Sequence, residues 1–161
     1  MRTYKARHLL AEICRTQGRF IEAEIHWRIA VAERGDYEPA WHGLAEPYLR
    51  QERWSDLEYL LEKLEGQGIA LGKIGWIRAR GLVQRKEYPS ARRALERVIA
   101  QDGQALGPRV LLSQVLLQEG RDWEAAERAL RDVLSVDPHH AETKHNLGVL
   151  LRRLGRELAT V

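Results

Sequence analysis

Residues 41–54 read WHGLAEPYLRQERW, an amphipathic run that closes in a turn-like segment ending on an aromatic residue. That closing segment begins at Gln51, and similar segments begin at Gln17, Arg85 and Glu119, so that each starts 34 residues after the one before. A fixed period of this length is typical of repeat proteins, in which every repeat is one supersecondary unit. The sequence therefore predicts an array of repeats.

Small and large apolar residues recur at fixed places around these turns. Seven residues before each turn glycine, or the residue in its place, stands a small residue, and apolar residues follow at intervals of three and four. Such intervals place side chains on one face of an α-helix. Each repeat is therefore predicted to be a helical hairpin that closes tightly at the small residues and encloses the large ones. The small residues are Ala11, Ala45, Ala79, Ser113 and Gly148. The residues directly before them are Leu10, Leu44, Arg78, Leu112 and Leu147. The large residues of the second helices are Trp27, Leu61, Leu95 and Leu130.

The composition favours an ordinary soluble protein. Hydrophobic residues make up 44% and charged residues 30% of the 161 residues, which argues against disorder. The formal net charge is +3 and the basic residues are scattered, so the charge does not indicate nucleic acid as a partner. Cys14 is the only cysteine, the charged N-terminus lacks the apolar core of a secretory signal, and no run is long enough to span a bilayer. We expect a cytoplasmic protein without membrane insertion.

The repeat resembles the tetratricopeptide repeat (TPR). This resemblance implies an all-α fold, a right-handed α-α superhelix of four helical hairpins and a C-terminal capping helix. It also implies one domain over residues 1–161, with repeats at about 4–37, 38–71, 72–105 and 106–140, a capping helix at 141–156, and Arg152, Arg153 and Arg156 facing outward. The residues that carry the match are Trp41, Leu44, Ala45, Tyr48 and Trp54, the small residues Ala23, Ala91 and Ala126, and Pro138.

The second repeat departs from the pattern. Pro47 falls inside its first helix and removes a backbone hydrogen bond, which costs about 3 kcal/mol unless the helix bends or starts late. Leu57 stands where a small residue is expected, and Gly66 and Gly68 end the second helix early. We therefore expect a bend or a widened loop at 66–73.

Several short runs are also similar to the TPR tails of bacterial family-2 glycosyltransferases. In those proteins the repeats follow a catalytic domain, whose Asp-x-Asp metal motif does not occur in this sequence. This second resemblance implies an accessory module of a larger glycosyltransferase, and the sequence leaves open whether 161 residues is the native length. The runs are 4–11, 108–113, 117–123 and 142–147.

In TPR arrays the first helix of each repeat lines a concave groove, and here the resemblance places polar and charged residues in it. Such a groove would suit an extended or helical peptide with acidic and apolar residues. The plainer alternative is that these charges only keep an exposed surface soluble. We expect a protein- or peptide-binding scaffold, with self-association through its end helices, no enzyme activity and no cofactor. The predicted groove residues are Lys5, His8, Glu12, Arg15, His42, Glu46, Arg50, Lys73, Trp76, Arg80, Gln84, Gln114, Gln118, His145 and Arg152.

Two histidine–glutamate pairs raise a third alternative, a metal-dependent enzyme. His8 and Glu12, like His42 and Glu46, have the i,i+4 spacing that places both side chains on one helix face, at equivalent positions of adjacent repeats. Zinc accepts such ligands, and an open zinc site activates water. The competing interpretation is two hydrogen-bonded pairs on a solvated surface, and on this interpretation no metal is bound.

Overall fold

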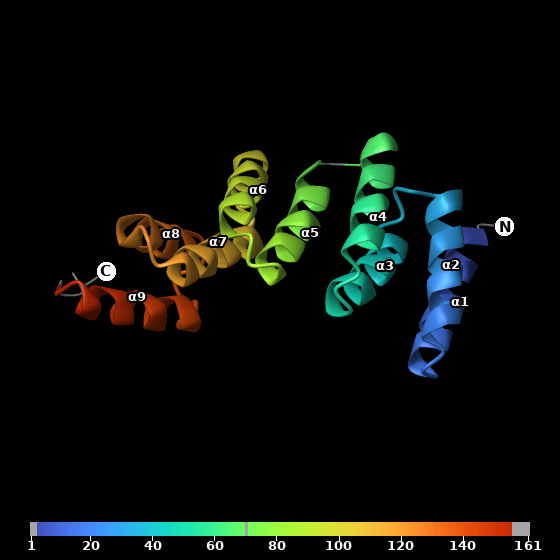
Figure 1. Cartoon of the computed structure of the whole chain (residues 1–161), viewed down its shortest axis with the longest axis horizontal. Helices are drawn as coiled ribbons and strands as arrows, with labels where there is room; N and C mark the ends of the chain where they lie inside the picture. The colour runs from blue at the N-terminus through green and yellow to red at the C-terminus, as the bar shows by residue number, and fades with distance from the viewer. Residues whose placement is uncertain (1–2, 70, 156–161) are drawn as a thin grey trace. The chain divides into compact units, whose positions relative to one another are not determined.

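The structure is a computed structural model that describes residues 3–69 and 71–155. These residues form nine α-helices and no strand (Figure 1). Arg156, which was predicted to close the capping helix, lies outside the described residues. None of the described helices is both long enough and apolar enough to cross a membrane. The helices are α1 (Thr3–Thr16), α2 (Phe20–Glu33), α3 (Glu38–Arg50), α4 (Trp54–Gly66), α5 (Leu71–Gln84), α6 (Tyr88–Gln101), α7 (Leu106–Glu119), α8 (Trp123–Val136) and α9 (Ala141–Arg153).

The chain divides into two compact units, residues 1–77 and residues 78–161. In the first unit α1 packs against α2, α2 against α3, and α3 against α4. In the second unit α6 packs against α7, α7 against α8, and α8 against α9. Packing thus follows chain order, as expected for stacked helical hairpins that cover each other's apolar faces. The predicted all-helical hairpin architecture is confirmed.

The turns inside the hairpins share one backbone conformation at the same point of the period. Gly18, Glu52, Lys86 and Gly120 all have positive φ, at 75°, 56°, 60° and 64°. In the first three turns the N–H of the next residue donates to the carbonyl five residues earlier, at 2.8 to 2.9 Å. This left-handed ending satisfies carbonyls that the helix leaves without partners. It explains why the turns keep their spacing although two of them lack glycine.

All five of the predicted small residues are buried, as close packing of the helices requires. Ser113 is the one polar residue among them, and its hydroxyl donates to the carbonyl of Val110 at 2.7 Å. The four large residues of the second helices, Trp27, Leu61, Leu95 and Leu130, are buried as well. The close-packing pattern inferred from the period is therefore confirmed.

Leu10, which belongs to an apolar column of the repeat, and two tryptophans beside the turns are not fully buried. Leu10 occupies the column of Leu44 but is exposed, because no described helix precedes α1 and covers it. Trp54 and Trp123 follow the turns and are only half-buried, packed against the edges of their clusters. The size and the periodic spacing of these three residues did not indicate that they lie at the margin of the core.

The second repeat is more regular than its sequence suggests. Pro47 lies inside α3, which nevertheless runs from Glu38 to Arg50 and does not start late. Helix α4 ends at Gly66, as expected, and Gly68 follows with a φ of +76°. Residues 67–70 separate α4 from α5, and the other links between hairpins, 34–37, 102–105 and 137–140, are equally long. The predicted widening of this loop is therefore wrong.

Candidate functional site: a cleft in the first unit

A cleft of about 620 Å³ opens between α1 and α2 on one side and α3 on the other. Phe20, Ile21 and Trp27 of α2 supply apolar surface, to which Leu44 of α3 adds. Charged side chains surround this surface, and the turn after α3 closes the cleft with Arg53. The cleft thus joins an apolar floor to a charged rim, which is the usual composition of a site that binds another molecule.

Helix α3 approaches α2 closely because residue 43 is glycine. A Cβ at Gly43 would lie 2.4 to 2.7 Å from atoms of the Trp27 ring. The indole is buried, and its Nε1 donates to Nδ1 of His8 at 3.2 Å. Because the ring is fixed on both sides, a larger residue at position 43 would push α3 outward. Gly43 therefore sets the separation between the two walls of the cleft.

His42 is held by two residues of its own helix, one of which also pairs with α5. Its ring stacks on Trp41, with centroids 4.1 Å apart, and its Nε2 lies 3.4 Å from the Glu38 carboxylate. Glu38 also pairs with Lys73 of α5. The Lys73 ammonium, with His42 in a smaller part, lowers the pKa of the Glu38 carboxyl. His42 thus presents one ordered edge to the cleft.

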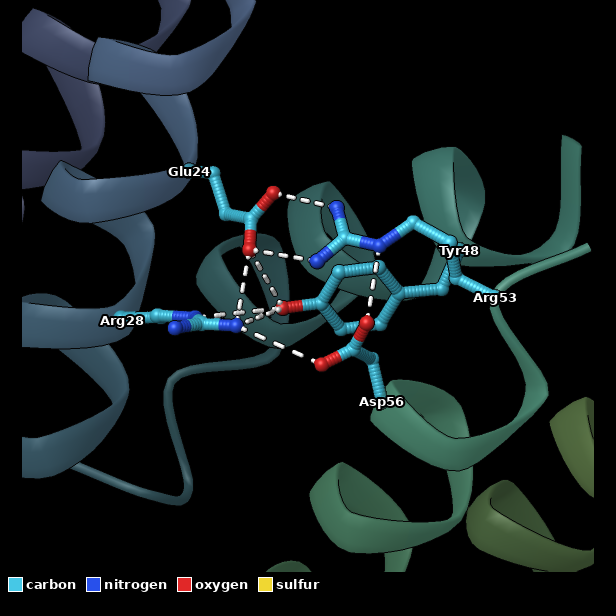
Figure 2. A network of polar contacts seen from close by, with 5 residues as sticks. All are labelled: Glu24, Arg28, Tyr48, Arg53 and Asp56. Atoms are coloured by element: carbon cyan, nitrogen blue, oxygen red, sulfur yellow. Dashed lines mark hydrogen bonds and ion pairs between the residues drawn. The ribbon is translucent and has the colours of Figure 1, made fainter. Parts of the chain in front are cut away.

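Five polar residues from α2, α3 and the start of α4 form one network, and three of them, Glu24, Tyr48 and Arg53, line the cleft (Figure 2). The guanidinium of Arg53 donates to both oxygens of Glu24, at 2.6 and 3.1 Å, and to Asp56 at 2.8 Å. Arg28 pairs with Glu24 at 2.8 Å and donates to the Tyr48 hydroxyl at 3.3 Å. Tyr48 in turn donates to Glu24 at 3.1 Å. Glu24 is therefore the common acceptor that ties α2 to α3 and to the start of α4.

The network shifts the titration of its members. The hydrogen bonds from Arg53 lower the pKa of the Glu24 carboxyl, and burial opposes this only in part. Burial raises the pKa of the Tyr48 hydroxyl. The pKa of the Arg53 guanidinium is raised, chiefly by its bonds to Glu24. Glu24 is thus an ionised acceptor and Tyr48 a neutral donor at neutral pH.

The outer rim of the cleft carries charges of both signs. On α1, Arg15 donates to one oxygen of Glu12 at 2.7 and 3.0 Å. On α3, Glu46 and the exposed Arg50 line the opposite side. The rim therefore offers both donors and acceptors to a bound chain.

Five of the predicted groove residues line this cleft, and they are Glu12, Arg15, His42, Glu46 and Arg50. The other predicted residues of the first unit lie outside it. Lys5 is exposed on α1, His8 lies beneath the floor against Trp27, Lys73 pairs with Glu38, and Trp76 packs on the core.

The six remaining predicted residues belong to the second unit and are not part of this cleft. Gln114 donates to Glu142 at 3.1 Å, which links α7, the first helix of the fourth hairpin, to α9. Arg80 is half-buried, and Gln84, Gln118, His145 and Arg152 are exposed.

The two histidine–glutamate pairs do not meet in a metal-binding group. Across residues 3–69 and 71–155, no cluster of three or more His, Cys, Asp or Glu side chains has an arrangement that could hold a metal ion. His8 accepts from Trp27 and packs edge-on against Tyr37. His42 instead faces Glu38, so the geometry gives the metal-enzyme hypothesis no support.

Sequence reasoning missed the residues that α2 and the turn after α3 contribute. It considered only the first helix of each repeat, whereas Phe20, Ile21, Glu24 and Arg53 also line the cleft. A signal was present for Phe20, which is the aromatic residue of the first turn. Arginine recurs at the position of Arg53, in Arg19 and Arg121, and Glu58 stands one period after Glu24, but the prediction drew on the first helices alone and did not use these columns.

Comparison with known proteins places this geometry among TPR structures. No protein-family model matches the chain. One curated protein, NPG1 of Arabidopsis thaliana, is 28% identical over 120 residues, which are 72% of this chain and 17% of NPG1. The chain therefore corresponds to a small part of the length of that relative.

Solved structures resemble the chain over most of its length. YrrB, described as a TPR protein with an unusual peptide-binding site, has a TM-score of 0.67 and 19% identity, covering 94% of this chain and 77% of YrrB. MamA has a TM-score of 0.74 and 18% identity, covering 95% of this chain and 83% of MamA. Residues 41 to the end of MamA from Desulfovibrio magneticus RS-1 have a TM-score of 0.71 and 19% identity, with 95% and 86% covered. At these identities the likeness establishes the fold, and the chain is a TPR-type helical solenoid.

Proposed function

We propose that the protein is a non-enzymatic TPR scaffold that binds a segment of another polypeptide in the cleft of its first unit. One observation carries the proposal: a cleft of about 620 Å³ whose walls include five residues expected to line a peptide groove. The likeness to YrrB supports it, because that TPR protein has a peptide-binding site. The other predicted groove residues would extend contacts beyond the cleft.

The side chains around the cleft favour a peptide with one apolar anchor and an acidic residue near it. The apolar anchor would contact Phe20, Ile21 and Trp27. An acidic group would find Arg50, which is exposed at the rim. Glu46, on the same helix one turn before Arg50, would accept hydrogen bonds from the peptide backbone or a basic side chain.

The test is selection of a random peptide display library on the immobilised chain, followed by titration of the enriched peptides in solution. Arg50→Glu should weaken binding about tenfold or more, because it replaces a hydrogen-bond donor at the rim by a carboxylate that repels an acidic peptide. Arg97→Glu, an exposed arginine on α6, is the matched control and should bind as the wild type does. Equal weakening by both variants, or enriched peptides that bind regardless of Arg50, would place the binding surface elsewhere.

An accessory role within a larger glycosyltransferase is the alternative. The short runs that resemble the TPR tails of bacterial family-2 enzymes favour it, and the NPG1 match, which covers 17% of that protein, is consistent with a module inside a longer chain. In either case we expect the segment to act in the cytoplasm without nucleic acid. Detecting the native polypeptide by immunoblot and measuring its intact mass separates the two, since a free adaptor has the mass of this chain.

A further inference from the structure

The outer face of α1 is apolar and exposed. Ala6, Leu9, Leu10 and Ile13 follow the i, i+3, i+4, i+7 pattern that places four side chains on one helix face. Leu10 is 44% and Ile13 49% exposed. We call these four residues the α1 face. None of them lines the cleft, so the α1 face is a separate surface.

In later repeats the residues of the same columns are buried or half-buried, and none is exposed. Leu44 and Leu147, the counterparts of Leu10, are 2% and 4% exposed, and Val115, a counterpart of Ile13, is fully buried. Ala40, one period after Ala6, is buried too. The α1 face therefore has the residue types that pack between helices in later repeats, but no described part of the chain covers it.

The second helix of the preceding hairpin covers these columns elsewhere. Helix α2 packs against α3, α6 against α7, and α8 against α9. Gly43, in the column of Leu9, shows how close this packing is, because it lies against Trp27 of the preceding helix. The partner that suits the α1 face is thus another helix with aliphatic side chains along one side.

Within the described residues, α9 at the far end of the chain does not present such a stripe. Its exposed side chains include Glu142, His145, Arg152 and Arg153, with Val149 as the only large apolar one. Head-to-tail stacking would therefore set an apolar face against a charged one. The α1 face, in contrast, is complementary to itself.

We propose that the α1 face is the dimer interface between two copies of this chain, with the two α1 helices antiparallel about a twofold axis between Leu9 and Leu10. In this register Ala6 of one copy lies opposite Ile13 of the other, so a small side chain faces a large one. The two Leu9 side chains meet on one side of the axis and the two Leu10 side chains on the other. A helix rises about 1.5 Å per residue, so the two Ile13 side chains are about 10 Å apart along the helices.

Charges at the edge of the face fit the same register. On a helical projection Lys5 and Glu12 both flank the edge beside Leu9, seven residues apart in the chain. Within one copy their spacing of two turns keeps them apart. Across the proposed twofold axis Lys5 of one copy lies about 3 Å along the helix from the level of Glu12 of the other. Glu12 accepts from Arg15 at the rim of the cleft, and in the dimer it would also pair with Lys5 of the other copy, which gives two symmetric Lys5–Glu12 pairs.

The first test is the mass of the full chain by sedimentation across roughly three decades of concentration. The wild type should shift from monomer to dimer, and Leu10→Glu and Ile13→Glu should remain monomeric. Val149→Glu is the matched control, since Val149 is 46% exposed on the opposite end helix, and it should dimerise like the wild type. A monomeric wild type, dimeric Leu10→Glu, or monomeric Val149→Glu would each overturn the proposal. Circular dichroism checks that each variant is folded.

The second test examines the register. Lys5→Glu and Glu12→Lys should each weaken the dimer several-fold, and the double exchange should restore it. Leu9→Cys should form an intermolecular disulfide under mild oxidation, whereas Ile13→Cys should not, because a bridge requires Cα atoms within about 7 Å. A mixture of Ala6→Cys and Ile13→Cys chains should crosslink. Failure of the charge exchange to restore dimerisation, or crosslinking of Ile13→Cys alone, would contradict the antiparallel pairing. Peptide binding by Leu10→Glu should stay intact, so the dimer and the cleft are tested separately.

Discussion

The guanidinium of Arg53, in the turn between α3 and α4, donates to both carboxylate oxygens of Glu24 on α2, at 2.6 and 3.1 Å. The pair joins residues 29 positions apart and lies over the Tyr48 ring, with the guanidinium carbon 4.6 Å from its centroid. Two hydrogen bonds to one carboxylate fix orientation as well as distance. The contact therefore ties the second hairpin to the first, between two residues that line the cleft.

Replacing Arg53 by alanine should lower the free energy of unfolding by about 1 to 3 kcal/mol, because Glu24 keeps its burial but loses its main partner. Arg19 stands one period earlier and pairs only with its neighbours Gln17 and Glu22. Arg19→Ala is therefore the control and should change stability by less than about 0.5 kcal/mol. Urea denaturation measures both, and equal losses would mean that the link between hairpins contributes little.

The same pair predicts a dependence on pH. Since Arg53 lowers the pKa of Glu24 in the folded state, the stabilisation is present above the unfolded value, near 4.3, and is lost as the pH falls through the lowered folded value. Glu24→Gln should be less stable than the wild type at pH 7, and the difference should shrink at about pH 3. Denaturation at both values tests this. A difference that is the same at pH 3 and pH 7 would show that ionisation of Glu24 is not its source.

The period was sufficient to predict the hairpins, because it reflects contacts that every repeat makes. Ala11 and Ala45, for example, are both buried, and the recurrence of a small residue at this position was enough to predict their burial. The Arg53–Glu24 link depends on a contact between two neighbouring hairpins, and the recurrence of arginine at this position does not indicate its partner. Leu10 shows where the period misleads. Its column predicts burial, but Leu10 is exposed because no described helix packs on that side of α1.

The candidate site was predicted in part for a related reason. The first-helix rule found His42 and Arg50, whose placement follows from the repeat. It could not find Ile21, because the equivalent residues Ser55, Pro89 and Glu124 form no apolar column. The width of a cleft depends on the distance between two helices, which here is set by Gly43. The spacing of residues along one helix does not predict that distance.

The hairpin turns predict opposite effects of two substitutions. Glu52 adopts a φ of 56°, a conformation that side chains with a Cβ disfavour by about 1 kcal/mol. Glu52→Gly should therefore leave stability unchanged or raise it by up to about 1 kcal/mol. Gly18, at φ 75° in the equivalent turn, should lose about 1 kcal/mol on change to alanine. Thermal unfolding compares the two, and a destabilising Glu52→Gly would indicate a contact of that side chain that outweighs the strain.

Gly43→Ala should open the cleft and destabilise the first unit. The new Cβ would lie 2.4 to 2.7 Å from the indole of Trp27, whose Nε1 is bonded to His8, so either the ring or α3 must move. Overpacking of this kind costs about 1 to 3 kcal/mol, more than the roughly 1 kcal/mol that alanine gains over glycine inside a helix. Unfolding in urea gives the free energy of unfolding of the variant and of the wild type.

Gly66→Ala is the control for this substitution, because no atom lies within 4 Å of a Cβ built at Gly66. At the end of α4 it should be neutral or stabilise by up to about 1 kcal/mol. Peptides selected on the wild-type chain should bind Gly43→Ala more weakly and Gly66→Ala equally well, since only the first change separates α3 from α2. A Gly43→Ala variant with wild-type stability and wild-type peptide affinity would mean that the Trp27 ring yields freely, and that the contact at residue 43 does not set the width of the cleft.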